Sequence, residues 1–312
     1  MMSLPFKKFF KIILSNGLSA AGFIIVIIFI ALAIIYTILG NSMLPYNPYQ
    51  INLFNVNLPP SSTHLFGTDN LGRDIFSRVI AALPIDLGVS LLIVGISLII
   101  GIFLGIIAGY FRGIIEEIIM RLTDLFLAFP PLILPLAIAA TLGPSLVNVT
   151  FALIFVWWPP YVRLIRGATL QVSASDFVTM SKVLNTPFLK IVFKNILPNI
   201  ITIVIIYATV DIGTALLQLS TLGFLGIGIP INTPELGMMA SILTTNLYQY
   251  PFEGLIPATF IFIIVMGFSL LGEGLTGIID PNIRGHLISR KKRLEEVSKY
   301  KKLETLETKI SD

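Results

Sequence analysis

The chain has 312 residues, of which 55% are hydrophobic and only 12% are charged. Soluble domains carry about 25% charged residues, so this composition excludes an ordinary water-soluble protein. The absence of cysteine excludes disulfides, thiolate catalysis and cysteine–zinc sites. The two histidines, His64 and His286, are predicted to be surface residues and not ligands of a shared metal ion.

Long uncharged blocks predict an all-α integral membrane protein, because a helix needs about 20 apolar residues to cross the hydrocarbon core. The first block follows three lysines, as a signal peptide would. Its apolar stretch is longer than the usual 7–15 residues and lacks a small-residue cleavage site, so we expect it to be retained. The six predicted transmembrane helices are Leu18–Leu39, Leu87–Tyr110, Leu125–Leu142, Leu146–Val162, Ile196–Leu222 and Gly254–Gly272.

The lysines and arginines predict the orientation, because cytoplasmic loops hold the excess of positive charge. With the N-terminus inside, 19 of the 21 basic residues are cytoplasmic and only Arg73 and Arg78 are outside. Both termini are therefore predicted to be cytoplasmic. The chain divides into 1–40 (N-terminus and first helix), 41–86 (extracytoplasmic segment), 87–285 (five-helix core with a cytoplasmic loop at 163–198) and 286–312 (charged cytoplasmic tail).

The extracytoplasmic segment begins with an irregular loop rich in Asn and Pro. Farther along, Arg73 can pair with Asp69 or Asp74 and fix a short interfacial helix that ends at Ile80. If exposed, an external ion pair of this sort contributes about 0–1 kcal/mol. We expect it to serve packing in preference to ligand contact.

The third predicted span contains Pro130, Pro131 and Pro135, each of which removes a backbone donor and should bend the helix. A bent helix fits either a span that lines a translocation path or a tightly packed bundle. Upstream, Arg121 and Asp124 have the i, i+3 spacing of an ion pair at the inner membrane edge.

The cytoplasmic loop predicts a helix, a break and a second helix. Ser175 or Asp176 can cap a short helix, Phe177–Leu184, and Asn185 tolerates the left-handed conformation that ends one. Phe177, Met180 and Leu184 share one face of that helix. This apolar face suits either insertion into a partner's groove or packing on the chain's own bundle.

Catalytic and nucleotide-binding motifs are missing from the sequence. No Gly-x-x-x-x-Gly-Lys-Ser/Thr occurs, and no Ser/His/Asp set or paired-carboxylate site stands out. Asp211 is the only ionisable residue well inside a predicted span, and such a residue is expensive in lipid. It either faces a translocation path and binds a cationic group, or pairs with a polar group of a neighbouring helix.

The loop also resembles the coupling motif of ABC importer permeases, which reads Glu-Ala-Ala, three residues, Gly, nine residues, Ile-x-Leu-Pro. The tail of that motif is present as Ile196-Leu197-Pro198. Thr179-Met180-Ser181 stand where Glu-Ala-Ala is usual, and Asn185 stands at the Gly. The missing Glu removes a charged contact that the family would make with its ATPase.

Further ordered matches over about His64–Gly285 are similar to the dipeptide, oligopeptide and nickel permeases. The extra N-terminal span is similar to the C-type subunit of such pairs. The matching segments are 64–74, 120–124, 128–130, 158–159, 163–167, 223–228, 233–237, 271–275 and 280–284.

The resemblance implies a type I ABC importer permease fold and a non-catalytic permease that forms half of a translocation path. It implies coupling to ATPases through Phe177, Thr179, Met180, Ser181, Leu184, Asn185, Ile196, Leu197 and Pro198, with Asp211, Pro130 and Pro131 on the possible path. Expected partners are a second permease, two ATPase subunits that hold ATP and Mg²⁺, a solute-binding protein and the bilayer, but no nucleic acid. This chain is expected to bind no cofactor itself. Peptides lead as substrate, nickel or oligosaccharides are alternatives, and an ion-coupled secondary transporter is the alternative from another class.

Overall fold

The computed structural model describes residues 17–242 and 248–279, and the predicted all-α class is confirmed for these ranges. The predicted tail at 286–312, with His286, lies outside the described residues. The elements are α2 (Gly17–Leu39), η1 (Gly40–Met43), η2 (Leu53–Asn55), α3 (Ile75–Phe111), α4 (Gly113–Leu127), α5 (Ile133–Leu142), α6 (Leu146–Trp157), α7 (Pro159–Ser173), α8 (Asp176–Val183), α9 (Phe188–Ile191), the π-helical η3 (Val192–Ile196), α10 (Leu197–Phe224), α11 (Leu236–Ala240) and α13 (Phe252–Ile279).

Five helical stretches within the described residues are long and apolar enough to cross a membrane, and they contain five of the six predicted spans. They are Gly17–Met43, Ile75–Phe111, Leu146–Ser173, Phe188–Phe224 and Phe252–Thr276. The second stretch begins well before the predicted span, because Asp74 caps α3 by accepting a hydrogen bond from the Ser77 N–H at 2.8 Å. The predicted short interfacial helix is therefore the first part of α3. This helix continues without a break across Pro84 into the predicted span that begins at Leu87.

The remaining predicted span, Leu125–Leu142, which is the third in chain order, is not one helix. Helix α4 ends at Leu127, and α5 begins only at Ile133. Pro130 and Pro131 lie in the gap, where each lacks a backbone N–H and restricts the residue before it. The prolines thus break the helix and do not merely bend it.

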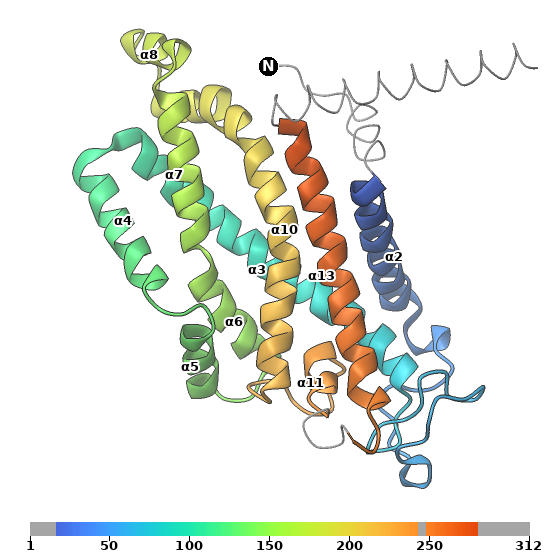
Figure 1. The fold of residues 1–312 in the computed structure, drawn as a ribbon. Helices are drawn as coiled ribbons and strands as arrows, with labels where there is room; N and C mark the ends of the chain where they lie inside the picture. The colour runs from blue at the N-terminus through green and yellow to red at the C-terminus, as the bar shows by residue number, and fades with distance from the viewer. Residues whose placement is uncertain (1–16, 243–247, 280–312) are drawn as a thin grey trace, which may run out of the picture.

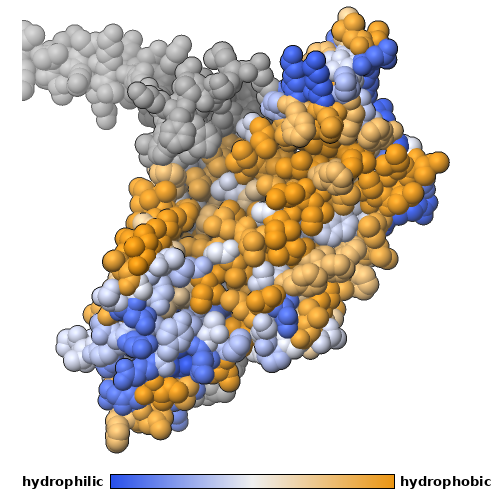
Figure 2. Space-filling view, turned by 180° about the vertical axis from the view of Figure 1, so that it is seen from behind, coloured by the Kyte–Doolittle hydropathy of each residue, from blue (hydrophilic) through white to orange (hydrophobic). Residues whose placement is uncertain are grey.

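The long helices lie side by side in one bundle (Figure 1). Helix α8 projects from one end, where α2 begins and α13 finishes, and the segment between α2 and α3 forms the opposite end with α11 close by. Figure 2 shows a broad apolar belt across the molecule, with hydrophilic residues gathered at the opposite end and mixed with apolar ones at the α8 end. A continuous apolar belt of this kind matches the surface that lipid requires of a membrane-spanning bundle.

Helices α3 and α7 pack closely because α3 presents three glycines to α7. A Cβ atom on Gly105 would lie 2.8 Å from Cβ of Ile165, and one on Gly109 would lie 2.7 Å from Cβ of Thr169. A Cβ on Gly101 would collide with Tyr161. Small residues at such spacing let two helix backbones approach in a membrane, where packing contacts drive association.

The segment before α3 is fixed by buried charges. The Arg73 Nε donates to Asp69 Oδ2 at 2.7 Å, and Arg78 Nε lies 3.6 Å from the same oxygen. All three side chains are buried. The predicted pairing of Arg73 with one of its two neighbouring acids is confirmed for Asp69.

Asp74, the other neighbouring acid, pairs with His64 at 2.9 Å. The expectation that His64 is a surface residue is wrong, since its ring is buried and stacks on Tyr46 with 4.4 Å between centroids. A hydrogen-bond partner and an aromatic face together compensate the burial of the imidazole.

Two fully buried carboxyl groups hold the short helix α11 in place. Glu235 accepts hydrogen bonds from the Gly237 N–H at 2.9 Å and the Met238 N–H at 2.6 Å. Asp86, from α3, accepts from the Leu236 N–H at 3.1 Å. The N–H groups of the first turn are thereby satisfied. Burial raises the pKa of Glu235 to about 7.

This raised pKa makes stability depend on pH. The folded state binds a proton that the unfolded chain releases at the ordinary glutamate pKa, so the free energy of unfolding should fall as pH rises from about 4.5 to about 7 and then level off. We expect Glu235→Gln to remove this part of the slope. Thermal unfolding of both proteins in detergent, measured across the pH range, checks it, and parallel curves for the two proteins would contradict the assignment.

The glycine contact between α3 and α7 gives a second prediction. Gly105→Ala should lower the free energy of unfolding by about 1–3 kcal/mol, because overpacking forces the helices apart. Gly95→Ala, also in α3, is the matched control, since a Cβ there meets nothing within 4 Å. The control should leave the melting temperature unchanged or raise it, because Ala favours the helix over Gly. Equal melting temperatures for the two variants would refute the close contact.

Candidate coupling helix, intramembrane carboxylate and outer cavity

Helix α8 has the boundaries and the termination that the sequence predicts, within one residue. Asn185 has a φ of 51°, so it adopts the left-handed conformation expected there. The Asn185 N–H donates to Lys182 O, and the Thr186 N–H donates to Ser181 O, both at 3.0 Å. These bonds satisfy carbonyls at the end of α8. The predicted side-chain cap is absent: Ser175 occupies the cap position, but its hydroxyl donates to Val172 O.

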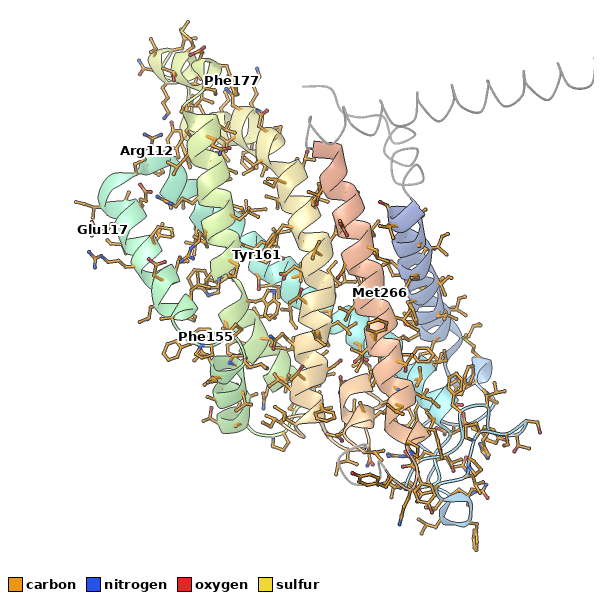
Figure 3. All side chains as sticks on the ribbon, viewed as in Figure 1. Arg112, Glu117, Phe155, Tyr161, Phe177 and Met266 are labelled. Carbon is orange, nitrogen blue, oxygen red and sulfur yellow. The ribbon has the colours of Figure 1, made fainter. Side chains whose placement is uncertain are left out.

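The predicted apolar face of α8 is exposed. Phe177 is 49% exposed, Met180 is 60% exposed and Leu184 is 73% exposed, although α8 projects beyond the membrane-spanning helices (Figure 3). Val183 is also exposed and extends this surface, which sequence reasoning missed. Val178 points the other way and is fully buried, so it attaches α8 to the bundle. Among the described residues, this face does not pack on the chain's own bundle, which was one of the two predicted alternatives.

The remaining predicted coupling residues have different positions. Thr179 is exposed on α8, and Ser181 accepts a hydrogen bond from Asn195 Nδ2 at 3.1 Å, which links α8 to η3. Ile196 is fully buried, Leu197 is partly buried, and Pro198 is exposed at the first turn of α10. Ile196, Leu197 and Pro198 therefore lie at the junction of η3 and α10, away from the exposed face of α8.

The sequence did not predict an aromatic cluster of Tyr110, Phe111 and Phe188 next to α8. The Phe188 ring lies 4.8 Å from that of Tyr110 and 4.9 Å from that of Phe111, so α9 rests on the end of α3. The Lys182 Nζ lies 4.5 Å from the Tyr110 ring centroid. A cation over an aromatic face is attracted by the ring quadrupole. Helices α3, α8 and α9 are thus joined at one point.

Ion pairs hold α4 against α7. The Arg163 Nη2 donates to Asp124 Oδ1 and the Arg166 Nε donates to Glu116 Oε1, both at 2.6 Å. The predicted Arg121–Asp124 pair is wrong, because Arg121 pairs instead with Glu117, one helical turn before it. Asp124 instead pairs with Arg163 of α7.

Asp211 lies at the middle of α10 and pairs with aromatic donors of neighbouring helices. Its Oδ2 accepts hydrogen bonds from Trp157 Nε1 and Tyr161 OH, both at 2.7 Å. Figure 3 places Tyr161 midway along the bundle, away from Phe177. Of the two predicted roles for Asp211, pairing with a polar group of a neighbouring helix is present in the structure.

Pro130 and Pro131 are exposed between α4 and α5. In the described part of the chain, no hydrogen bond or ring contact joins either of them to Asp211. That the three residues line a translocation path stays a prediction.

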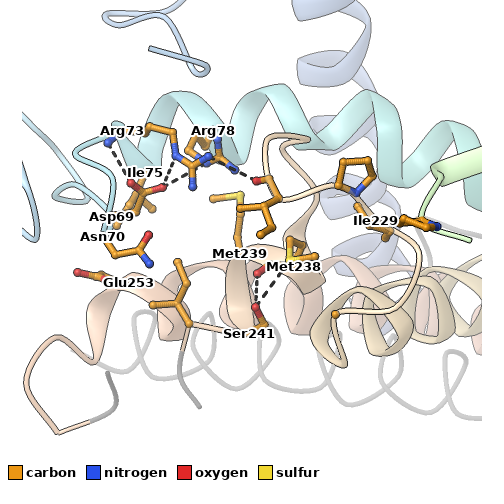
Figure 4. Close-up of a pocket in the computed structure, with 15 residues that line it drawn as sticks. Asp69, Asn70, Arg73, Ile75, Arg78, Ile229, Met238, Met239, Ser241 and Glu253 are labelled. Atoms are coloured by element: carbon orange, nitrogen blue, oxygen red, sulfur yellow. Dashed lines mark hydrogen bonds and ion pairs between the residues drawn. The ribbon is translucent and has the colours of Figure 1, made fainter. Parts of the chain in front are cut away.

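A cavity of about 660 Å³ lies between the segment before α3, helix α11 and the loop after α10, at the end opposite α8. Figure 4 shows it in close-up. Asp69, Arg73 and Arg78 form one wall, and Glu253 lies on another. The loop after α10 contributes apolar residues, and Arg73 Nη1 donates to Ile231 O at 3.4 Å. The buried ion-pair network thus has a second role, since it shapes a cavity of mixed charge at this end.

Comparisons with known proteins place the chain. Residues 101–285 match the family described as "Binding-protein-dependent transport system inner membrane component". The chain is 39% identical to the dipeptide transport system permease protein DppC of Haemophilus influenzae, over 84% of this chain and 91% of that protein. Identity is 37% to DppC of Alkalihalophilus pseudofirmus, over 90% and 91%.

A glutathione transport system permease protein, GsiD of Escherichia coli, is 36% identical over 83% of this chain and 86% of that protein. The crystal structure of an amino acid ABC transporter with histidines covers 64% of this chain and 92% of its own, at a TM-score of 0.49 and 17% identity. The extent and identity of the permease matches decide the assignment. The chain belongs to the inner membrane permease components of binding-protein-dependent ABC importers, in their dipeptide/oligopeptide group.

Proposed function

We propose that this chain is one of two permease subunits of an ATP-driven importer of di- and oligopeptides, and that α8 is its docking element for an ATPase subunit. The exposed apolar face of Phe177, Met180 and Leu184 carries the proposal, because it lies on a short helix that projects from the bundle. An isolated amphipathic helix of this kind fits a hydrophobic groove on a partner. Relatives that transport dipeptides and glutathione support the peptide substrate.

The proposed topology has six membrane crossings and two cytoplasmic termini. Helices α4 and α5 together form the third crossing, with Pro130 and Pro131 at its break. The start of α2 and the end of α13 lie at the same end as α8, which supports a common cytoplasmic side. The excess of Lys and Arg in the predicted inner segments supports the same orientation.

The proposed mechanism converts movement of α8 into movement of the spanning helices. A solute-binding protein delivers peptide to the outer cavity, and two ATPase subunits, which hold ATP and Mg²⁺, close on nucleotide binding. Displaced α8 would pull on η3 through Ser181–Asn195, and α9 would push on α3 through the Phe188–Tyr110 contact. Helices α3 and α10 would then alternate access to a path shared with the second permease. This chain performs no chemistry itself.

The docking role predicts a specific loss of assembly. Met180→Asp or Leu184→Asp should reduce co-purification of the ATPase at least about tenfold, which corresponds to about 1.4 kcal/mol, because a charge would be buried in an apolar groove. Uptake should be abolished and membrane insertion unchanged. Leu53→Asp is the matched control, since Leu53 is 72% exposed at the opposite end of the molecule. Normal recovery of the ATPase with the α8 variants would exclude α8 as the docking element.

The energy source distinguishes this function from ion-coupled transport. In proteoliposomes that contain both permeases and both ATPases, with the binding protein added outside and ATP enclosed, labelled dipeptide should accumulate only when ATP is hydrolysable. Collapse of the proton and sodium gradients should leave uptake unchanged. Uptake that follows an ion gradient without ATP would overturn the proposal.

A further inference from the structure

The hydrogen bonds to Asp211 use only one of its two carboxylate oxygens. Trp157, from α6, and Tyr161, from α7, both donate to Oδ2. No hydrogen bond among the described residues reaches Oδ1, and the residue as a whole is partly exposed. Here the two donors fix the orientation of the group and leave one oxygen available.

Asp211 also lacks a countercharge. Each ion pair found among the described residues involves another acid, and none brings a Lys, Arg or His side chain within 4.0 Å of Asp211. An ionised carboxylate in the middle of a membrane span is expensive, and two neutral donors compensate it only in part. A cation from outside this part of the chain would complete the compensation.

The surroundings of Asp211 favour an ammonium group in particular. The Tyr207 ring lies one helical turn before Asp211, 37% exposed, and meets the Tyr161 ring edge-on with 5.3 Å between centroids. Trp157 supplies a third aromatic ring. An organic cation beside this carboxylate would be attracted by its charge and, over the face of a neighbouring ring, by cation–π interaction. A metal ion would require several oxygen ligands, and no group of three or more acidic, His or Cys residues occurs in the described part of the chain.

We infer that Asp211, with Trp157, Tyr161 and Tyr207, forms an intramembrane site for the ammonium group of the peptide in transit. The inference rests on the proposed function, since it assumes a peptide path along α10. The one carboxylate then has both roles that the sequence left open: Oδ2 joins α10 to α6 and α7, and Oδ1 faces the path.

Thiol chemistry tests whether Asp211 presents a negative charge to an aqueous path. The chain has no cysteine, so Tyr207→Cys introduces a single thiol, whose labelling is followed by the mass of this chain. In the assembled transporter, a cationic methanethiosulfonate should react faster than an anionic one. Adding Asp211→Asn should lower that rate ratio at least about fivefold, because one charge at this range acts oppositely on the two reagents.

Ile205→Cys is the control position, because Ile205 is also on α10, is 50% exposed and lies away from Tyr207. Its labelling should be insensitive to Asp211→Asn. A free dipeptide at millimolar concentration should slow cationic labelling at Tyr207→Cys, and the N-acetylated dipeptide should not. An unchanged rate ratio, or equal protection by both peptides, would overturn the ammonium site.

Transport by Asp211→Asn gives the second test. Asn retains a carbonyl oxygen that can accept from Trp157 and Tyr161, so the variant removes the charge and keeps the helix contact. Dipeptide uptake should fall at least about tenfold, which corresponds to about 1.4 kcal/mol. ATPase stimulation by the loaded binding protein and recovery of the second permease should persist, and Asp211→Glu should restore part of the uptake.

Normal uptake by Asp211→Asn at equal protein level would overturn the inference. Loss of the second permease from that variant would also overturn it, because Asp211 would then pair with a cation of that subunit. Failure of the proposed function itself is distinguishable, since wild-type protein would then show no ATP-driven uptake before any variant is compared.

Discussion

The close approach of α3 and α7 is the contact on which the other features of this molecule depend. Three glycines on α3 leave room for Tyr161, Ile165 and Thr169 on α7. Tyr161 donates to Asp211 from the position that Gly101 makes possible, so a membrane carboxylate on α10 is oriented by a glycine on a different helix. In lipid, where apolar burial gives little preference for one helix neighbour over another, close backbone packing of this kind specifies the arrangement.

Helix α7 also connects the middle of the membrane to the projecting end. It begins at Pro159 beside Trp157 and Tyr161, binds α4 through Arg163 and Arg166, and reaches Ser173 just before α8. The opposite end depends on buried charge. Asp69 and Arg73 fix the segment before α3, while Asp86 and Glu235 fix α11. Breaking the buried Asp69–Arg73 pair would be costly, because it leaves a charge without compensation.

Much of the candidate site could be predicted from the sequence because its signals are local. The end of α8 at Asn185 follows from the tolerance of Asn for positive φ, and the exposed face of Phe177, Met180 and Leu184 follows from helical spacing. The break at Pro130 and Pro131 was underestimated as a bend. The burial of His64 and the partner of Asp124 were predicted wrongly, since His64 contacts Asp74 and Tyr46, and Asp124 contacts Arg163 on a different helix.

The sequence by itself determined the membrane class, five long spans, the short projecting helix and the permease family, because apolar length, helical spacing and ordered motifs are written along the chain. The tertiary structure alone decided which groups meet. It placed Trp157 and Tyr161 on one oxygen of Asp211, set Glu235 beside the first turn of α11, and put Phe188 against Tyr110. The partners of Asp211 lie 50 and 54 residues away, and such contacts are fixed by helix packing and not by local propensity.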